Sequence, residues 1–481
     1  MVNSDNIQQL NSGVIWVLVS HFSVIGMQFI AMIFLARLLT PKDFAIMGIA
    51  TFFIAISHTL ADSGLGGALL KKKEIKGIDY STLFIYNVIV AIIIYIVLLF
   101  LARPLSVFYD VETLEQIIYL IGLSILFGSF GIIQQVILLR ELKFRQMTII
   151  SIISSFTGLV TAIILAAKGF GVISLVVQNM IQIGLTVILQ LFCNRYFPIL
   201  KFSRTSFKEQ WSFGGHLLYS NLLNTAYDNV FSMIFPKIST LKFSGLYAQA
   251  NKIKQLPVNI ISSAINTAAF PILSKIENTE EFKQVNRNLA SKVYLFSYTI
   301  IIAISIFSKE VIHVILGEQW LDAASILSIL SIKAVFFIVS MFVRNSLKSM
   351  GATYRIFYIE LANSLIGLIM LGVTFYLGDY YILLGIVISQ IITTFISTLF
   401  LSLEGDYKLN EQWLDFFDII KIFFFPVFIV LAFKWLVELD DVFTAVIGGL
   451  IYFISLFVSG IMLKNLYIMK IYNNLVRITG R

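Results

Sequence analysis

The chain has 481 residues, of which 58% are hydrophobic and only 13% are charged, and its formal net charge is +8 at pH 7. A soluble globular protein of this composition could not cover its surface with polar groups, so the composition excludes that class and indicates an integral membrane protein. The basic residues lie in short loops between apolar stretches rather than on one face of a domain, which argues against a nucleic-acid partner.

Apolar stretches of membrane-spanning length follow one another along almost the whole chain. Residues 1–13 have neither a basic region nor a small-residue cleavage site, which predicts no cleavable signal peptide. A membrane helix needs roughly 20 residues, and hydropathy with helix breakers predicts about fourteen spans. Short connections and the lack of alternating strands predict an all-α, polytopic membrane protein. The spans lie at about 13–39, 44–62, 80–102, 114–138, 147–167, 170–193, 211–235, 243–271, 289–308, 322–348, 354–377, 381–403, 416–437 and 441–464.

Lysine and arginine residues are distributed unequally between the two sets of alternating loops. One set, with the C-terminal tail, carries about 23 of them and the other set about 7. The positive-inside rule assigns the richer set to the cytoplasm. Both termini are therefore predicted to be cytoplasmic, as an even number of spans requires.

The chain contains an internal repeat. PKDFAIMGIA at 41–50 is similar to LKFSGLYAQA at 241–250, and FRQMTIISIISSFTGL at 144–159 is similar to YRIFYIELANSLIGL at 354–368. Six predicted spans separate the copies, so both have the same orientation, as in parallel-repeat transporters. We therefore expect a six-helix lobe at 1–205, a second six-helix lobe at 206–405, and an extra helix pair with a cytoplasmic tail at 406–481.

Two lysines interrupt the predicted span at 243–271. A charge at membrane depth is costly, and such residues usually face a protein interior or a water-filled cavity. Lys254 lies about 200° round the helix from Lys252, and it is predicted to snorkel to the outer interface. The other polar residues share a face with Lys252 and predict the wall of an aqueous path; they are Gln255, Asn259, Ser262 and Asn266.

Two further places in the sequence predict charged contacts. Asn224 and Asp228 share a face of the 211–235 span at the depth of Lys252, which predicts an ion pair between Asp228 and Lys252 with either a structural or a functional role. Arg344 and Glu360 lie at similar depth on either side of a turn, so they are predicted to meet unless Arg344 reaches the cytoplasmic interface. Lys333 lies in the same predicted span as Arg344, at a spacing compatible with one helix face. The candidates for a substrate cavity are Lys252, Arg344, Lys333, Asp228, Glu360, Asn224, Gln255 and Asn259.

Motifs for catalysis, metals and cofactors are missing from the sequence. The four histidines show no metal-ligand spacing, and the single cysteine, Cys193, excludes an intramolecular disulfide and a cysteine-based metal site. There is no phosphate-binding loop and no dinucleotide fingerprint. We therefore expect no catalytic residue, no cofactor and no metal, and the protein is not predicted to be an enzyme.

Several phrases together resemble the Wzx-type polysaccharide flippases, near the colanic-acid and teichuronic-acid exporter subgroup. They are ARLLTPKDFAIMGIA, LADSGLGGALL, LLRELKFRQM, and GLYAQANKIKQLP followed by AAFPILSKI, and the resemblance covers about 1–400. It implies the fold of the multidrug/oligosaccharidyl-lipid/polysaccharide exporter superfamily, with two six-helix lobes in a V around a central cavity.

The same resemblance implies a function. Members of this family flip undecaprenyl-pyrophosphate-linked oligosaccharide from the cytoplasmic to the outer leaflet of the bacterial inner membrane, by alternating access, in the biosynthesis of cell-surface polysaccharides such as lipopolysaccharide. A cationic cavity and coupling to protons or sodium ions are implied. Besides the lipid-linked glycan and membrane lipids, the implied partners are a polysaccharide polymerase and a chain-length regulator.

Three alternatives stay open at this point. A cation-coupled drug antiporter of the same superfamily would favour acidic cavity residues and about twelve spans. A lipid II flippase has fourteen spans and a cationic cavity, but the quoted phrases are less similar to that family. A membrane glycan polymerase or ligase would carry a large outer loop with catalytic residues, and the predicted loops are too short for one.

Overall fold

The structure is a computed structural model of the full chain, and it describes residues 4–62, 65–72, 74–437, 439–465 and 467–469. The side chains of residues 4–14 and of several residues in the 204–238 helix also lie outside the description. All regular structure among the described residues is helical. The chain divides into two compact units, Met1–Gly245 and Leu246–Arg481, which are described separately below.

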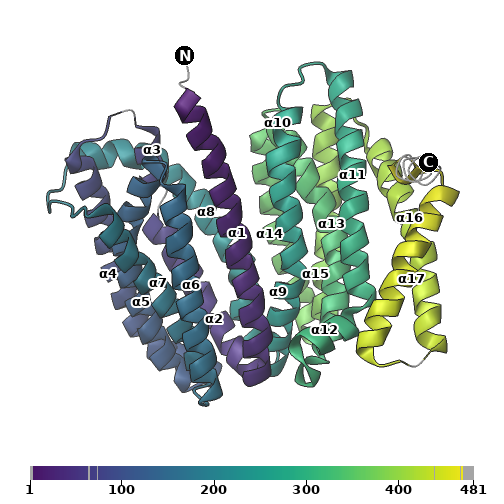
Figure 1. Cartoon of the computed structure of the whole chain (residues 1–481), viewed down its shortest axis with the longest axis horizontal. Coiled ribbons are helices and arrows are strands. Elements are labelled where there is room, and N and C mark those ends of the chain that lie inside the picture. Colours follow the sequence, from purple (N-terminus) through teal and green to yellow (C-terminus); the bar gives the residue numbers. More distant parts are fainter. Residues whose placement is uncertain (1–3, 63–64, 73, 438, 466, 470–481) are drawn as a thin grey trace. The chain divides into compact units, whose positions relative to one another are not determined.

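The described residues of the first unit form eight α-helices and the start of a ninth, which Figure 1 labels in chain order. α6 and α7 approach closely because Gly158 faces Gln178, where a Cβ would lie 3.0 Å from the carbonyl oxygen. Such small residues let membrane helices pack without a hydrophobic driving force. The helices are α1 (Ser4–Leu38), α2 (Pro41–Asp62), α3 (Leu65–Lys71), α4 (Gly77–Tyr109), α5 (Thr113–Arg140), α6 (Phe144–Ala167), α7 (Ile173–Asn194), α8 (Arg204–Ile238) and the start of α9 (Leu241–Ala264).

The second unit continues α9 and ends with α17. α9 contains Pro257 and passes through a π-helical turn before α10, so the predicted span at 243–271 is a bent helix rather than a uniform one. The remaining elements are η1 (Ile265–Ala269), α10 (Phe270–Leu273), α11 (Thr279–Ile306), α12 (Ser308–Leu316), η2 (Glu318–Trp320), α13 (Ala323–Ser349), α14 (Thr353–Thr374), η3 (Phe375–Leu377), α15 (Asp379–Glu404), α16 (Leu409–Leu436) and α17 (Asp441–Met462).

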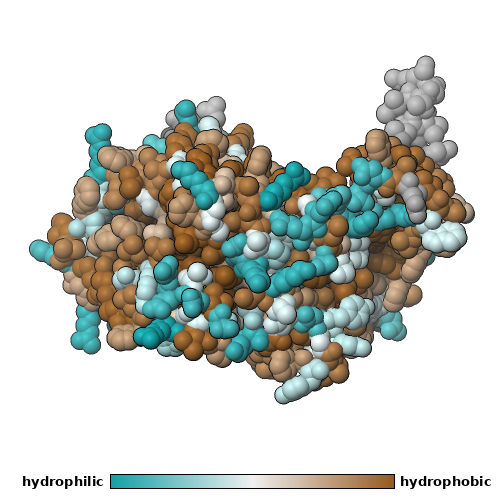
Figure 2. All heavy atoms as spheres, turned by 90° about the horizontal axis from the view of Figure 1, so that it is seen from below, coloured by the Kyte–Doolittle hydropathy of each residue, from teal (hydrophilic) through white to brown (hydrophobic). Residues whose placement is uncertain are grey.

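Thirteen helical stretches of described residues are long and apolar enough to cross a membrane. Large apolar side chains on these helices, such as Phe100, Phe192 and Phe428, are strongly exposed, as lipid-facing helices require. Figure 2, which looks from below onto the helix ends, shows hydrophilic residues there among apolar ones. The predicted all-α, polytopic membrane fold is therefore confirmed. The one predicted span without a counterpart among these thirteen is 211–235. It falls in α8, where several side chains lie outside the description, and it stays a prediction.

The same helix packing occurs in both units. In the first unit α4 packs on α5, α5 on α7 and α6 on α7; in the second unit α11 packs on α13, α13 on α15 and α14 on α15. These pairs follow the order of the sequence repeat. α8 departs from it, because it packs against α2 and α3 and so belongs to the first unit. The predicted lobe boundaries, which follow the repeat, stay predictions, as does a cavity between the lobes.

The first turns of α2 and α9, which carry the similar sequences at 41–50 and 241–250, touch inside the first unit. Asp43 Oδ2 accepts hydrogen bonds from the main-chain nitrogen and hydroxyl of Thr40, and Thr240 Oγ1 accepts one from the Phe243 nitrogen. These are N-terminal caps of the two helices. A Cβ at Gly245 would lie 1.8 Å from the carbonyl oxygen of Pro41, so only glycine fits at this approach.

Two ion pairs, one toward each end of α16, attach this helix to the rest of the second unit. Arg287 of α11 forms a bidentate pair with Asp415 of α16, at 2.7 and 2.6 Å. At the opposite end of α16, Lys434 Nζ lies 2.6 Å from Glu310 Oε1 of α12. α16 and α17 therefore form an additional pair packed on α11 and α12.

Candidate functional site

One face of α9 is polar and accessible. Lys252, Asn259 and Asn266 are exposed and Gln255 is half-buried, while Gln255 Nε2 donates to Asn259 Oδ1 at 2.9 Å. Most apolar residues of the helix, such as Ile253 and Ile261, are buried, whereas Ile260 is exposed. The predicted division of this helix into a polar and an apolar face is confirmed for the described residues.

Lys254 does not snorkel, so that prediction is wrong. Its residue is only 9% exposed, and its Nζ donates to Gln255 Oε1 at 3.2 Å. The helical period explains the difference, because Lys254 shares its face with Val258 and Ile261, which are buried. The amine is therefore held inside the second unit by a neutral amide.

Arg344 and Glu360 form the ion pair that the sequence predicts. Arg344 Nη1 of α13 lies 3.1 Å from Glu360 Oε1 of α14, and the side chains are 15% and 35% exposed. The guanidinium also lies 5.4 Å from the ring centre of Phe337. Arg344 is five residues before the end of α13, or roughly 8 Å along the helix axis. A charge pair is thus present inside an otherwise apolar span.

Neutral polar contacts continue from this pair through the helices of the second unit. Asn345 Nδ2 donates to Asn266 Oδ1 at 3.1 Å and so connects α13 with the π-helical turn. The α15 residues Ser397 and Thr393 contact Ser340 of α13 and Asn363 of α14, at 2.8 and 3.4 Å. Interhelical hydrogen bonds at membrane depth stabilise packing.

Three other candidates have no described contact with this group. Lys333 lies three helical turns from Arg344 on the same face of α13 and is half-buried. Asn224 and Asp228 lie in α8, where their side chains fall outside the described part. Asp228 and Lys252 belong to different units, so their predicted ion pair stays a prediction.

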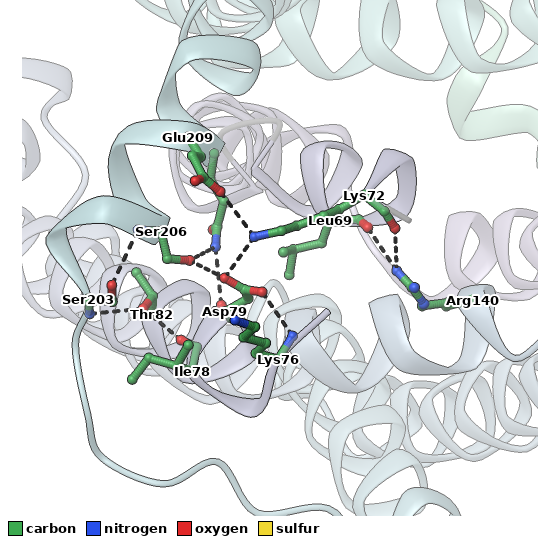
Figure 3. Close-up of polar contacts among 11 residues, drawn as sticks. Leu69, Lys72, Lys76, Ile78, Asp79, Thr82, Arg140, Ser203, Ser206 and Glu209 are labelled. Atoms are coloured by element: carbon green, nitrogen blue, oxygen red, sulfur yellow. Dashed lines mark hydrogen bonds and ion pairs between the residues drawn. The ribbon is translucent and has the colours of Figure 1, made fainter. Parts of the chain in front are cut away.

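A polar cluster in the first unit was not predicted from the sequence (Figure 3). Lys72, which follows α3, places its Nζ 3.1 Å from Asp79 Oδ1 and 3.0 Å from Glu209 Oε2. Ser206 Oγ donates to Asp79 Oδ1 at 2.5 Å, and the Lys76 nitrogen donates to Oδ2 at 2.9 Å. The cluster therefore joins the start of α4 to the start of α8.

Asp79 is the centre of this cluster. It is only 2% exposed, and its carboxylate accepts hydrogen bonds from Lys72, Ser206 and the Lys76 nitrogen. An acidic residue three positions into a helix is the usual sign of an N-terminal cap, and this was the available signal in the sequence. The hydrogen bond with Glu209 is the largest cause that raises the pKa of the Lys72 amine, against the opposing effect of its partial burial. Arg140 completes the arrangement by donating to the carbonyl oxygens of Leu69 and Lys72, at 3.1 and 2.9 Å.

Metal chemistry has no support among the described residues, where no group of three or more His, Cys, Asp or Glu side chains could hold an ion. The charged groups described above are Lys, Arg and their carboxylate partners. Such an arrangement can bind and neutralise an anion by charge and hydrogen bonds.

Comparison with known proteins gives the family. The profile of the family described as "Polysaccharide biosynthesis protein" matches residues 34–325. The chain is 24% identical over 339 residues to the succinoglycan biosynthesis transport protein ExoT of Rhizobium meliloti (strain 1021), which covers 69% of this chain and 67% of that protein. It is 22% identical over 324 residues to the lipopolysaccharide biosynthesis protein WzxC of Escherichia coli (strain K12). That match covers 67% of this chain and 66% of WzxC. The chain thus matches about two thirds of the length of these relatives.

A solved structure supports the fold independently. The lipid II flippase MurJ in an inward closed conformation superposes with a TM-score of 0.75, at 16% sequence identity, over 94% of this chain and 100% of that chain. At this identity the likeness concerns the fold alone. The resemblance to polysaccharide flippases that the sequence predicts is confirmed by the family match. The chain belongs to the polysaccharide biosynthesis protein family of integral membrane proteins.

Proposed function

We propose that this protein moves a lipid-linked oligosaccharide from the cytoplasmic leaflet to the outer leaflet during polysaccharide biosynthesis. The family and the names of its relatives ExoT and WzxC support a role in polysaccharide biosynthesis. The fold shared with MurJ supports transport rather than an enzymatic reaction. The observation that carries the proposal is the Arg344–Glu360 pair, with its polar neighbours, inside apolar helices.

The chemistry of the substrate fits such a site. A pyrophosphate-linked sugar has an anionic, hydrogen-bonding head that cannot enter hydrocarbon without losing its hydration. Arg344 offers planar N–H donors suited to phosphate oxygens, and Asn266 and Asn345 offer amides for hydroxyl groups. A substrate phosphate competing for Arg344 would displace Glu360, so the pair can open on binding. The long apolar tail needs no polar site because it can remain in lipid.

The finer aspects of the proposal concern location and coupling. The protein would reside in the bacterial inner membrane with both termini in the cytoplasm, as its loop charges predict. Undecaprenyl pyrophosphate would be the lipid carrier, and a polymerase with a chain-length regulator would act on the flipped product. An inside-negative potential favours outward movement of an anionic head by about 2.3 kcal/mol per charge per 100 mV, and proton or sodium coupling would add to this.

The test is a flipping assay with purified protein in vesicles. A fluorescently labelled, polyprenyl-pyrophosphate-linked oligosaccharide is incorporated, and its accessibility to a membrane-impermeant quencher is followed. We expect protein-dependent exposure of substrate from the inner leaflet, lost in Lys252→Ala but kept in the control Lys168→Ala, which removes an exposed lysine after α6. Movement of small organic cations without movement of the glycolipid would instead identify a drug antiporter and reject the proposal.

A further inference from the structure

The segment between α7 and α8, residues 195–203, has no helical structure, and we call it the linker. It belongs to the first unit and forms the teal loop at the left edge of Figure 1. α7 is long and apolar enough to cross the membrane and ends at Asn194. The linker therefore begins where a membrane helix leaves the hydrocarbon, at the level of the lipid headgroups.

Both ends of the linker are fixed to the first unit. Gln134 Nε2 of α5 donates to the carbonyl oxygen of Tyr196 at 2.9 Å, and the Tyr196 ring lies edge-on to Tyr80 with centres 5.6 Å apart. At the other end, the Ser203 nitrogen donates to Thr82 Oγ1 of α4 at 3.1 Å, as Figure 3 shows. The middle of the linker is thus held in place between two fixed points.

The side chains between these points are large, apolar and turned outward. Phe197 is 74% exposed, Ile199 66%, Leu200 77% and Phe202 50%. Adjacent exposed apolar side chains on a soluble surface are unfavourable in water and mark an interaction site. Because the ends are fixed by hydrogen bonds, the linker has no freedom to turn these side chains into the protein.

The charges within the linker and the first residues of α8 have one sign, up to Glu209, which is paired with Lys72. Arg195, Lys201, Arg204 and Lys208 are all exposed, and residues 195–208 contain no Asp or Glu. Apolar and aromatic side chains interleaved with basic ones are typical of segments that lie in a membrane interface and attract anionic lipids. A protein partner would have to provide both an apolar and an acidic surface at the same depth.

We propose that the linker is a membrane-surface anchor. Phe197, Ile199 and Leu200 insert into the boundary between headgroups and acyl chains, while Arg195 and Lys201 contact the phosphates of anionic lipids. With the predicted topology, this is the cytoplasmic leaflet. The anchor fixes the start of α8, which the Asp79 cluster also holds, and it does not depend on the proposed function.

The turn at 375–381 provides a matched control within the same chain. It follows the membrane helix α14 and exposes Tyr376 and Leu377, at 87% and 57%. Its sequence, FYLGDYY, contains Asp379 and no basic residue. A label there should enter the interface through apolar contacts alone, without a response to anionic lipid.

The test uses the full chain in vesicles. Cys193→Ser removes the native thiol, and Leu200→Cys or Tyr376→Cys then carries an environment-sensitive fluorophore. Vesicles of phosphatidylcholine, with or without phosphatidylglycerol, contain lipids with a nitroxide quencher high on the acyl chain. We expect the fluorophore at position 200 (the 200 label) to emit at a shorter wavelength than it does in water and to be quenched by the nitroxide. Both effects should be stronger in vesicles that contain phosphatidylglycerol. The double change Arg195→Gln/Lys201→Gln should abolish that increment, and the 376 label should show none.

Two outcomes would overturn the proposal. One is a 200 label that stays water-exposed and unquenched in both kinds of vesicle. A label that is exposed in vesicles but shielded in native membranes would assign the surface to a protein partner instead. Elution of each variant as a single symmetric peak in gel filtration separates these results from misfolding. The changed side chains are exposed, and Tyr376 also contacts the ring of its neighbour Phe375, with centres 4.8 Å apart.

Discussion

The Arg344–Glu360 pair can be replaced by the residues that the other repeat carries at the same places. With α6 aligned on α14, Arg344 corresponds to Gln134 and Glu360 to Ile150. Both counterparts are buried, and neither is charged. The same helix packing therefore forms in the first unit without an ion pair, and the fold does not require one in the second.

The structure gives the size of the expected effects. Breaking a buried ion pair by removing one partner costs about 3–5 kcal/mol, whereas a surface pair contributes less than about 1 kcal/mol. Arg344 is 15% exposed and Glu360 35% exposed, so Arg344→Gln alone should lower the free energy of unfolding by about 2 kcal/mol. The double variant Arg344→Gln with Glu360→Ile leaves no unpaired charge. Its free energy of unfolding should be equal to that of the unchanged protein or higher by up to about 1 kcal/mol.

Thermal unfolding in detergent and glycolipid flipping in vesicles then separate the two roles of the pair. If Arg344 binds the anionic headgroup, the double variant should be stable but flip at least about tenfold more slowly, because a hydrogen bond to a charged group contributes about 1.5–3 kcal/mol. A stable double variant with an unchanged flipping rate would show that Arg344 has no part in transport. A double variant as unstable as the single one would refute the argument from the repeat.

Two other sites give predictions on stability. Gly245→Ala should lower the melting temperature and the yield of folded protein, because its Cβ would meet the Pro41 carbonyl oxygen at 1.8 Å and overpacking costs about 1–3 kcal/mol; unchanged melting would show that α2 and α9 are not in this contact. Lys72→Met should lower the free energy of unfolding by about 1–2 kcal/mol by removing its two ion pairs, with the larger loss from the pair with the buried carboxylate. The bond to Glu209 raises the Lys72 pKa above its ordinary 10.5, so this contribution is complete below that value and is lost only as the pH rises past the raised pKa. The difference in melting temperature between the protein and Lys72→Met should therefore stay constant between about pH 7 and about pH 9; a decline within that range would contradict the ion pairing.

The order of the thirteen long apolar helices could be predicted because a bilayer sets their length and composition directly. Each span must satisfy its main-chain groups internally, so apolar stretches of about 20 residues become helices whatever their neighbours are. The repeat was visible for the same reason, since α5 and α13 keep their length and order. The place of α8 was not visible. It packs on α2 and α3 through contacts such as Thr59 with Thr225, whose hydroxyl oxygens lie 3.1 Å apart, and no local pattern specifies such a partner.

The charged residues show which part of a site a sequence can specify. The turn between α13 and α14 is short, so it fixes the depth of both helices and brings Arg344 to Glu360. The prediction for Lys254 is wrong because the face that it shares with Val258 and Ile261 is buried in the protein and does not reach the membrane interface. Asp79 was missed because its partner Lys72 lies across a loop and Ser206 comes from a helix more than a hundred residues away. Helical periodicity gives the direction of a side chain and a short turn gives its depth, but a contact between distant helices depends on packing that neither pattern contains.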